Sequence, residues 1–347
     1  MTLQEPFGKL QAKQITLAHG GGGKAMGDLI EDVFFSRFLP TDREDQARLH
    51  HDALRQDGAR LAFTTDSFVI HPLEFPGGDI GRLAVCGTVN DLAVGGGQPL
   101  WLSAAFIIEE GLEIDLLRKC VDSMRASADE AGVKIVTGDT KVVERGSADK
   151  MFITTSGVGI IPPDRHLSAA SVQAGDVAIV NGYLGDHGAT ILASRGDLAL
   201  NAQISSDCQP LNHLMEAVLQ AAPNIRCARD ATRGGLAASL NEIALAAAVG
   251  ITLDEAEIPL RREVKGMCEI LGLDPLYLAN EGTLVLFVPP SEAEQALMAM
   301  RATRAGAHAA IIGTAMEKTP GRVEMKTVFG GARVVDRLVG EQLPRIC

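Results

Sequence analysis

Residues 80–108 read IGRLAVCGTVNDLAVGGGQPLWLSAAFII, and this segment sets the architecture that we expect of the first half of the chain. Asp79 is predicted to cap a helix over residues 80–94, whose face is small and apolar apart from Asn90 and Asp91. Three glycines at positions 95–97 end the helix, and residues 100–108 are typical of a buried strand. The segment therefore predicts a helix that packs against a sheet.

Further strands and helices are expected on both sides of this segment. Residues 61–67 predict a short strand that ends at Asp66, and residues 133–137 predict one that ends just before Asp139. An amphipathic helix is expected over residues 113–131 and another strand over residues 151–161. This alternation predicts a mixed α/β (α+β) domain rather than an all-helical one.

The length and composition favour two domains. The chain has 347 residues, of which 46% are hydrophobic, so it can bury a sizeable core. The sequence Pro162-Pro163-Asp164 is the best boundary. We predict an N-terminal domain of residues 1–163, a C-terminal mixed α/β domain of residues 164–330, and a flexible tail of residues 331–347.

The charge and the apolar runs exclude several classes of partner. A net charge of -12 argues against nucleic acid or an anionic membrane, because both need clustered Lys and Arg. The start of the chain lacks the apolar stretch of a signal peptide, and the longest apolar run, residues 243–253, is too short to span a bilayer. The six cysteines are scattered without metal-site spacing. We expect a cytoplasmic protein.

Three carboxylates stand at the ends or edges of the predicted elements, namely Asp66, Asp91 and Asp139. Several carboxylates without nearby Cys or His indicate a hard cation, and Mg²⁺ carrying a nucleotide phosphate is its commonest use. Lys141 would then place a positive charge beside the phosphates. Two plainer alternatives remain: aspartates near glycine often form turns, and Asn90 with Asp91 could cap a neighbouring loop.

Two glycine-rich segments are candidates for binding anions through backbone amides. Gly20, Gly21, Gly22, Gly23 and Lys24 precede a predicted helix, although the same glycines would also suit a flexible linker. In the second half, a predicted strand runs through Asp230, Thr232 and Gly234 into a long helix. Glu281 is expected in a tight loop at the start of a further strand.

The chain ends in Pro344-Arg345-Ile346-Cys347. Sixteen extended residues, 332–347, reach roughly 50 Å at about 3.3 Å each, so the thiol of Cys347 could visit almost any pocket. A lone terminal cysteine is usually incidental, because chain ends tolerate change.

The order of these motifs carries a resemblance to a known superfamily. The stretches are HGGGGK (19–24), TDS (65–67), GTVNDLAVGG (87–96), TGDTKVV (137–143), GDHG (185–188) and RDATRGG (229–235). Together they resemble the aminoimidazole ribonucleotide synthetase and selenophosphate synthetase superfamily. With the terminal cysteine, the chain is most similar to the carbamoyl dehydratases of hydrogenase maturation.

This resemblance implies a fold, a reaction and partners. The N-terminal domains of a homodimer would pair into a barrel, with ATP and Mg²⁺ held nearby. A carbamoyltransferase would load Cys347 with a carboxamide, ATP-dependent dehydration would convert it to an S-cyanide, and an iron-binding maturation complex would accept the cyanide. By motif, the metal ligands would be Asp66, Asp91 and Asp139.

The same motifs imply roles for the other candidates. Asn90 and the glycine loop would contact nucleotide or phosphates, as would Asp230, Thr232 and Gly234 at the second anion candidate. For an amide to lose water, its oxygen must be phosphorylated and its nitrogen deprotonated. We therefore assign Glu281 as the base, and Lys141 as the residue that stabilises charge on the transferred phosphoryl group.

Two other functions stay open at this point. One is a small-molecule ATP-dependent synthetase of the aminoimidazole ribonucleotide or selenophosphate type, in which Cys347 is incidental. The other is a nucleotide-sensing scaffold that docks partners through the tail. Removing Cys347 separates the first from the dehydratase, and a mass change at Cys347 separates the second.

Overall fold

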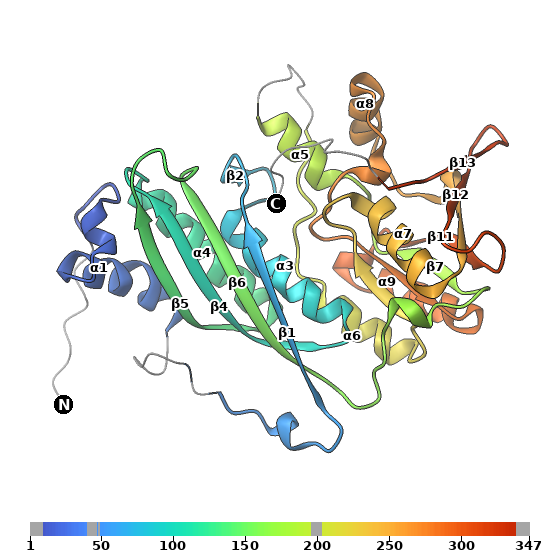
Figure 1. Cartoon of the computed structure of the whole chain (residues 1–347), viewed down its shortest axis with the longest axis horizontal. Helices are drawn as coiled ribbons and strands as arrows, with labels where there is room; N and C mark the ends of the chain where they lie inside the picture. Colours follow the sequence, from blue (N-terminus) through green and yellow to red (C-terminus); the bar gives the residue numbers. More distant parts are fainter. Residues whose placement is uncertain (1–9, 40–46, 48, 196–202, 338–347) are drawn as a thin grey trace.

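The computed structural model describes residues 10–39, 47, 49–195 and 203–337, and it contains two main sheets (Figure 1). The first sheet has four strands and the second has seven. Together they give the mixed α/β architecture that the sequence predicts. No helix in these ranges is long and apolar enough to cross a membrane.

The first sheet is antiparallel except for its β4–β5 pair, which is parallel. In spatial order its strands are β1 (Arg60–Phe68), β6 (Met151–Ile161), β4 (Gln98–Glu109) and β5 (Lys134–Val143). Helices α3 (Ile80–Val94) and α4 (Ile114–Ala131) cover one face, behind the strands in Figure 1. The predicted helix over residues 80–94 is confirmed, and Asp79 caps it through the amides of Gly81 and Arg82.

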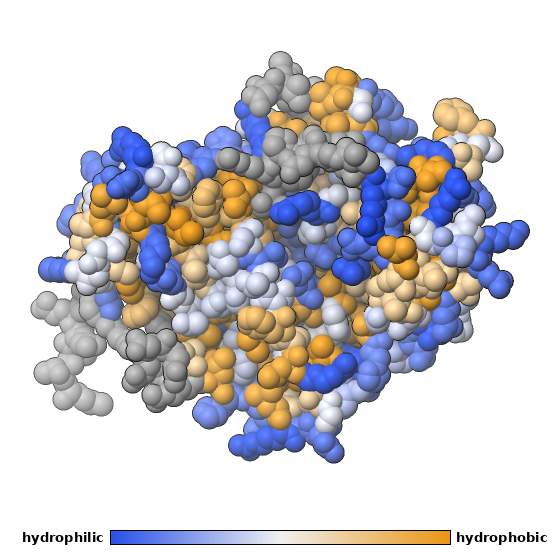
Figure 2. Space-filling view, viewed as in Figure 1, coloured by the Kyte–Doolittle hydropathy of each residue, from blue (hydrophilic) through white to orange (hydrophobic). Residues whose placement is uncertain are grey.

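Among the described residues, no helix or strand covers the other face of the first sheet. Along β1 exposed and half-buried residues alternate, because successive side chains point to opposite faces. The register places Phe63 beside Val158, and Val158 beside Trp101, on the open face. Leu61 and Phe63 are 63% and 71% exposed there. Figure 2 shows this side, with pale, weakly polar side chains across the sheet and apolar ones beside them.

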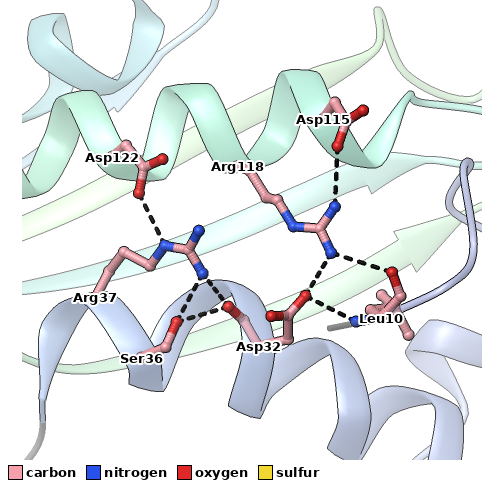
Figure 3. Close-up of polar contacts among 7 residues, drawn as sticks. All are labelled: Leu10, Asp32, Ser36, Arg37, Asp115, Arg118 and Asp122. Carbon is pink, nitrogen blue, oxygen red and sulfur yellow. Dashed lines mark hydrogen bonds and ion pairs between the residues drawn. The ribbon is translucent and has the colours of Figure 1, made fainter. Parts of the chain in front are cut away.

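The N-terminal segment packs against α4 through a partly buried ion-pair network (Figure 3). Its helices are α1 (Lys24–Leu29), a π-helix (Ile30–Phe35) and α2 (Ser36–Phe38). Arg118 of α4 pairs with Asp32, whose carboxylate also accepts the amide of Leu10 at 3.0 Å. Burial acts to raise the pKa of Asp32, but the bonds from Arg118 and Leu10 outweigh it and hold that pKa below its usual value.

The second sheet lies between two helical layers. Its order is β13 (Ala332–Val334), β12 (Val323–Lys326), β9 (Gly250–Asp254), β11 (Ala310–Met316), β7 (Val177–Val180), β10 (Leu284–Val288) and β8 (Cys227–Asp230). Helix α7 (Gly235–Ala247) packs on the face of Val285 and Phe287, while α6 (Asn212–Ala221) and α9 (Ala293–Arg301) pack on the face of Leu284 and Leu286. All five residues of β10 are buried for this reason.

The remaining elements connect and flank the two sheets. They are β2 (Glu74–Phe75), β3 (Gly78–Asp79), α5 (Asp186–Ser194) and α8 (Arg262–Leu271). Helix α6 also contacts α3, and Ala93 and Val94 of α3 belong to the same buried cluster as α6. The two parts of the chain therefore share an apolar contact beside α3.

Two expectations about strand ends are wrong in detail. Strand β5 continues through Asp139 to Val143, so Asp139 lies within a strand rather than at its end. Residues 332–334, which we assigned to the tail, form β13, and Val335 is fully buried. Each stretch keeps its pairing because a neighbouring strand satisfies its backbone groups.

Candidate active site

A small polar pocket of about 230 Å³ lies where the two parts of the chain meet. It is lined by Asp66 of β1, Asp91 of α3, Asp230 at the end of β8, Thr232 in the following turn, and Glu281. Residues that are distant in the sequence therefore converge, and four of them are carboxylic acids. Asp230 and Thr232 lead into α7, whose N-cap is Gly234 with φ 80°.

The carboxyl groups of this pocket destabilise one another's charge. Burial, together with the charges of Asp91 and Asp230, raises the pKa of Asp66 to about 6. Burial and the charge of Asp91 likewise raise the pKa of Asp230 to about 6. Burial raises the pKa of Asp91, although Thr64 donates a 2.7 Å hydrogen bond to it. A bound cation would relieve this repulsion.

The residue types fit Mg²⁺, but the described residues do not build a full coordination cage. Within the described ranges, no group of three or more Asp, Glu, His or Cys side chains has the geometry to hold a metal ion. Mg²⁺ is usually held by one or two carboxylates together with phosphate oxygens and water. The pocket therefore fits a metal that arrives with a nucleotide.

Asp139 and Lys141 form a second cluster on β5. Lys141 Nζ lies 2.7 Å from an oxygen of Asp139, and both side chains are more than half exposed. The hydrogen bond from Lys141 is the main reason that the pKa of Asp139 is lowered. The glycine loop lies beside this pair, because a Cβ on Gly20 would come within 2.9 Å of Val142.

The rest of that loop leaves room for a ligand. A Cβ on Gly22 or Gly23 would meet nothing within 4 Å, and Gly22 has φ 74°. Lys24 pairs with Asp28 at 2.6 Å and its side chain is 86% exposed. The loop is thus fixed at Gly20 and open at its tip.

The two clusters lie on opposite faces of the first sheet. Asp139 is in register with Ala105, which pairs with Thr154 and then Ser67, and these side chains share the open face. Asp66 is displaced by one residue from Ser67, so it points toward α3. Within one chain, alternation along the strands therefore separates Asp139 from Asp66 and Asp91, and a metal site shared by all three stays a prediction.

Asn90 connects α3 to the loop that carries Glu281. Its Nδ2 donates to the carbonyls of Gln209 and Glu281, at 3.1 and 3.3 Å, and its Oδ1 accepts the amide of Leu211 at 2.8 Å. Both amide hydrogens are used in these bonds. In this chain Asn90 holds the Glu281 loop, and its contact with nucleotide stays a prediction.

Asp207 is a further residue of the site that our sequence analysis missed. Its carboxylate accepts the amides of Glu281 and Gly282, both at 3.0 Å, and the hydroxyl of Thr283 at 2.9 Å. A Cβ on Gly282 would lie 1.9 Å from the carbonyl oxygen of Asp207. No motif or periodic pattern marks Asp207, so only the tertiary fold reveals that it fixes the Glu281 loop.

The family profiles and the known relatives agree on what this chain resembles. The N-terminal domain of AIR synthase related proteins matches residues 44–161, and their C-terminal domain matches residues 173–326. The chain is 66% identical to the carbamoyl dehydratase HypE of Rhodobacter capsulatus, over 97% of this chain and 99% of that protein. It is 49% identical to the HypE of Escherichia coli K12, over 96% and 99%.

This chain belongs to the HypE family of carbamoyl dehydratases.

Solved structures of HypE proteins have the same fold. A HypE solved in complex with ATP is 45% identical, covers 95% of this chain and 99% of its own, and has a TM-score of 0.90. A HypE–HypF complex has a TM-score of 0.78 at 43% identity, covering 91% and 100%. The superfamily suggested by the glycine and aspartate motifs is confirmed.

In the sequence analysis we assigned the carboxamide to the terminal cysteine, but Cys347 lies outside the described residues. The other cysteines, Cys86, Cys120, Cys208, Cys227 and Cys268, are all buried. Burial is the first cause that raises the thiol pKa of Cys227 and of Cys268, each to about 11. Burial keeps all five of these thiols out of reach of a substrate.

Proposed function

We propose that this chain uses ATP to dehydrate a carboxamide carried on its own Cys347, which yields an S-cyanide for the iron of a [NiFe]-hydrogenase. The observation that carries the proposal is the near full-length identity of 66% to a carbamoyl dehydratase HypE. The convergence of Asp66, Asp91, Asp230 and Glu281 in one pocket supports it, because phosphoryl transfer and proton removal need such groups together.

The reaction balances with ATP as the only co-reactant. The carboxamide oxygen attacks the γ-phosphorus, the bond to the bridging oxygen breaks, and ADP leaves. The nitrogen then gives up two protons, the C–O bond breaks with phosphate as the leaving group, and C≡N remains on sulfur. Phosphorylation is needed because the unmodified amide oxygen is a poor leaving group.

Glu281 is the candidate base for the nitrogen protons. Its side chain is only 2% exposed and lines the carboxylate pocket. Asp207 and Asn90 bind its backbone from two directions, so the loop cannot drift from the substrate. Asp66 and Asp91 would contribute ligands to Mg²⁺, which neutralises phosphate charge when bound. Asp230, Thr232 and Gly234 would lie beside the nucleotide at the start of α7.

Lys141, Asp139 and the glycine loop of residues 20–24 would reach this chemistry through a homodimer. Asp139 and Lys141 lie on the open face of the sheet, away from Glu281, and the glycine loop contacts β5 at Val142. We propose that the open faces of two chains pair into a barrel, so that this cluster of one chain meets the pocket of the other. The apolar band of Phe63, Val158 and Trp101 supports such pairing, because exposed apolar patches mark interfaces.

Mixed dimers test this sharing. A chain with Glu281→Ala and a chain with Lys141→Ala should each be inactive alone. Co-expression with two affinity tags should restore activity in the doubly tagged dimer, because one of its two sites would be intact. Mixed dimers that are as inactive as the parent variants would contradict the shared site. Lys141 and Glu281 would then have to act in the same chain.

The donor and the acceptor would be other maturation proteins. A relative of this chain is solved as a HypE–HypF complex. We propose that a protein of the HypF type is the carbamoyltransferase that loads Cys347, and that an iron-binding maturation complex receives the cyanide.

Intact-mass analysis and infrared spectroscopy test the activity itself. The carbamoylated chain with Mg²⁺ and ATP should lose one water at Cys347 and gain a nitrile band, and the Cys347→Ala chain should give neither. ATP turnover on a diffusing amide that survives Cys347→Ala would instead indicate the small-molecule synthetase. Nucleotide binding without any change of mass at Cys347 would indicate a scaffold.

A further inference from the structure

The proposed reaction does not use the GDHG motif of residues 185–188, yet this motif packs against the segment that leads to Glu281. The motif forms the start of α5. Gly188 donates its amide to the carbonyl of Ala279 at 3.0 Å. A Cβ on Gly188 would come within 3.2 Å of the amide nitrogen of Ala279, so a larger side chain would crowd this contact.

The first glycine of the motif reaches the same segment through a side chain. Gly185, with φ 79°, donates its amide to Oδ1 of Asn280 at 2.7 Å. The Nδ2 of Asn280 donates to the carbonyl of Ala231 at 2.7 Å. Ala231 lies between Asp230 and Thr232, which line the carboxylate pocket. The start of α5 is therefore connected both to the Glu281 loop and to the turn beside it.

His187 acts on a second segment, the one that carries Asp207. Its side chain is fully buried, with its ring edge-on to Phe75 at 5.4 Å between centroids. Its Nδ1 lies 2.8 Å from Oγ of Ser206. The same Oγ accepts the amide of Cys208 at 3.1 Å. The two hydrogen bonds span Asp207, so they fix the residue between them.

Asp207 needs such support because it lies outside regular secondary structure. Residues 203–211 form no helix or strand, so no ladder of backbone hydrogen bonds sets the position of Asp207. Its carboxylate nevertheless accepts the amides of Glu281 and Gly282, both at 3.0 Å. A shift of Asp207 would therefore displace Glu281, and a displacement of about 1 Å at a reacting group can cost roughly 10²-fold in rate.

We propose that His187 is a positioning residue for the dehydration, because its hydrogen bond with Ser206 sets the place of Asp207 and Asp207 sets the place of Glu281. His187 does not line the carboxylate pocket, so it acts through Glu281 rather than on the substrate. The inference rests on the proposed function for the role of Glu281 as base. The order of the Glu281 loop can be measured without the reaction.

A double-mutant cycle between His187 and Glu281 tests this role, with single-turnover nitrile formation at saturating ATP as the measured rate. His187→Leu removes the hydrogen bond at similar side-chain volume, and it should lower the rate roughly tenfold to a hundredfold. In the Glu281→Gln background the same substitution should change the rate by less than about twofold, because the base that His187 positions is gone. Losses that multiply would overturn the positioning role.

Hydrogen exchange in the full chain without ATP measures the loop itself. Exchange of the amides of Glu281 and Gly282 should quicken roughly tenfold in His187→Leu, because both amides donate to Asp207. His187→Asn keeps a polar atom near the place of Nδ1, so it should retain most of the protection and most of the rate. Parent-like exchange of these two amides in His187→Leu would contradict the proposal.

Ser206→Ala removes the same hydrogen bond from its other end, and it keeps the test valid if His187→Leu does not fold. It should reproduce the slower reaction and the faster exchange. The double variant should be no worse than either single variant, because both remove one contact. Additive effects of the two substitutions would show that His187 does not act through Ser206.

His213→Leu is the matched control. His213 lies on α6, and its Nε2 is 3.0 Å from the carbonyl of Glu130, in an exposed contact. Both the rate of nitrile formation and the exchange of the Glu281 amide should equal those of the parent chain. An equal loss in His213→Leu would overturn the specific role of His187.

The two measurements separate this inference from the proposed function. Faster exchange of the Glu281 amide in His187→Leu, in a parent chain that forms no nitrile, would support the loop architecture and contradict the dehydratase. Nitrile formation at the parent rate in both His187→Leu and Ser206→Ala would support the dehydratase and overturn the positioning role.

Discussion

At the scale of single residues, the carboxylates of the small pocket repel one another, and a bound cation would reduce this repulsion. Asp66 and Asp230 both have a pKa of about 6, above the ordinary value of an aspartate, with burial as the first cause. The folded chain therefore holds these protons more tightly than the unfolded chain. Their contribution to stability is present below pH ~4 and is lost as the pH rises through about 6.

In the presence of a non-hydrolysable ATP analogue, Mg²⁺ should therefore stabilise the chain more at pH 7.5 than at pH 5, because protons compete with the metal at the lower pH. Thermal unfolding with and without Mg²⁺ at the two pH values measures this. Asp66→Asn should raise the metal-free stability at pH 7.5 by about 1–2 kcal/mol, since it removes the least favourable charge, and should reduce the Mg²⁺ effect. Equal shifts at both pH values would count against metal binding here.

Glu281→Gln should keep the loop and remove the base. The bonds from Asp207 and Asn90 reach backbone atoms of residue 281, so the substitution leaves them in place. We expect single-turnover nitrile formation to fall by about 10²–10⁴-fold with ATP affinity unchanged. Rapid-quench mass analysis of the carbamoylated chain measures the rate, and a fall of less than tenfold would assign the base elsewhere.

At this scale, the sequence predicted which residues belong to the site better than it predicted which of them lie close together. Asp66, Asp91, Asp230 and Glu281 were singled out and lie together, whereas Asp139 lies on the other face of the sheet within one chain. This separation follows from the one-residue alternation along β1 and β5, which depends on the strand register. Asp207 could not be found, because its role consists of contacts to residues more than seventy positions away.

At the scale of helices and strands, the N-terminal segment depends on one ion pair. Arg118 and Asp32 are 10% and 14% exposed, and Asp32 also accepts the amide of Leu10. Asp32→Asn removes the buried one of the two carboxylates that pair with Arg118 and leaves only the exposed Asp115 at 2.9 Å (Figure 3). We expect a loss of about 3 kcal/mol in urea unfolding, at the low end for buried pairs because both side chains keep some contact with water.

Asp122→Asn is the control for this prediction. Asp122 lies on α4, as Arg118 does, and pairs with Arg37 of α2 at 2.8 Å. Its side chain is 57% exposed. Exposed pairs contribute about 0–1 kcal/mol, so this variant should unfold almost as the parent chain does. Equal losses for the two variants would show that burial does not set the value of the Arg118–Asp32 pair.

Helices were easier to predict than strand lengths. The 15 residues of α3 follow a clear cap, Asp79, and the 18 residues of α4 show an apolar face in the sequence. Strand β5 was predicted too short, because Gly138 and Asp139 are typical of turns. Its pairing with β4 over residues 134–143 overrides that local preference.

At the scale of the whole molecule, the open face of the first sheet is the feature that one chain leaves incomplete. Phe63→Glu should place a charge in the apolar band and prevent pairing of two chains. Analytical ultracentrifugation should then show a monomer, whereas Phe329→Glu should leave the dimer intact because Phe329, 96% exposed, lies in the β12–β13 hairpin of the other sheet. A dimer that survives Phe63→Glu would rule out pairing through this face.

The two-sheet plan followed from the alternation of predicted elements and from Pro162-Pro163. The packing of the two sheets relative to each other could not be predicted. It depends on the apolar contact of α6 with α3 and on the hydrogen bonds of Asn90, and no local sequence pattern marks either of them. Those contacts bring Asp66 and Asp91 to Asp230 and Glu281. The site therefore depends on tertiary packing that no single motif encodes.

A crystal structure of the full chain with Mg²⁺ and a non-hydrolysable ATP analogue measures the central claim most directly. We predict Mg²⁺ at about 2.0–2.1 Å from an oxygen of Asp66 or Asp91, with the γ-phosphate between that ion and Glu281 and the thiol of Cys347 beside it. A triphosphate bound away from these carboxylates, with Cys347 out of reach of it, would contradict the account.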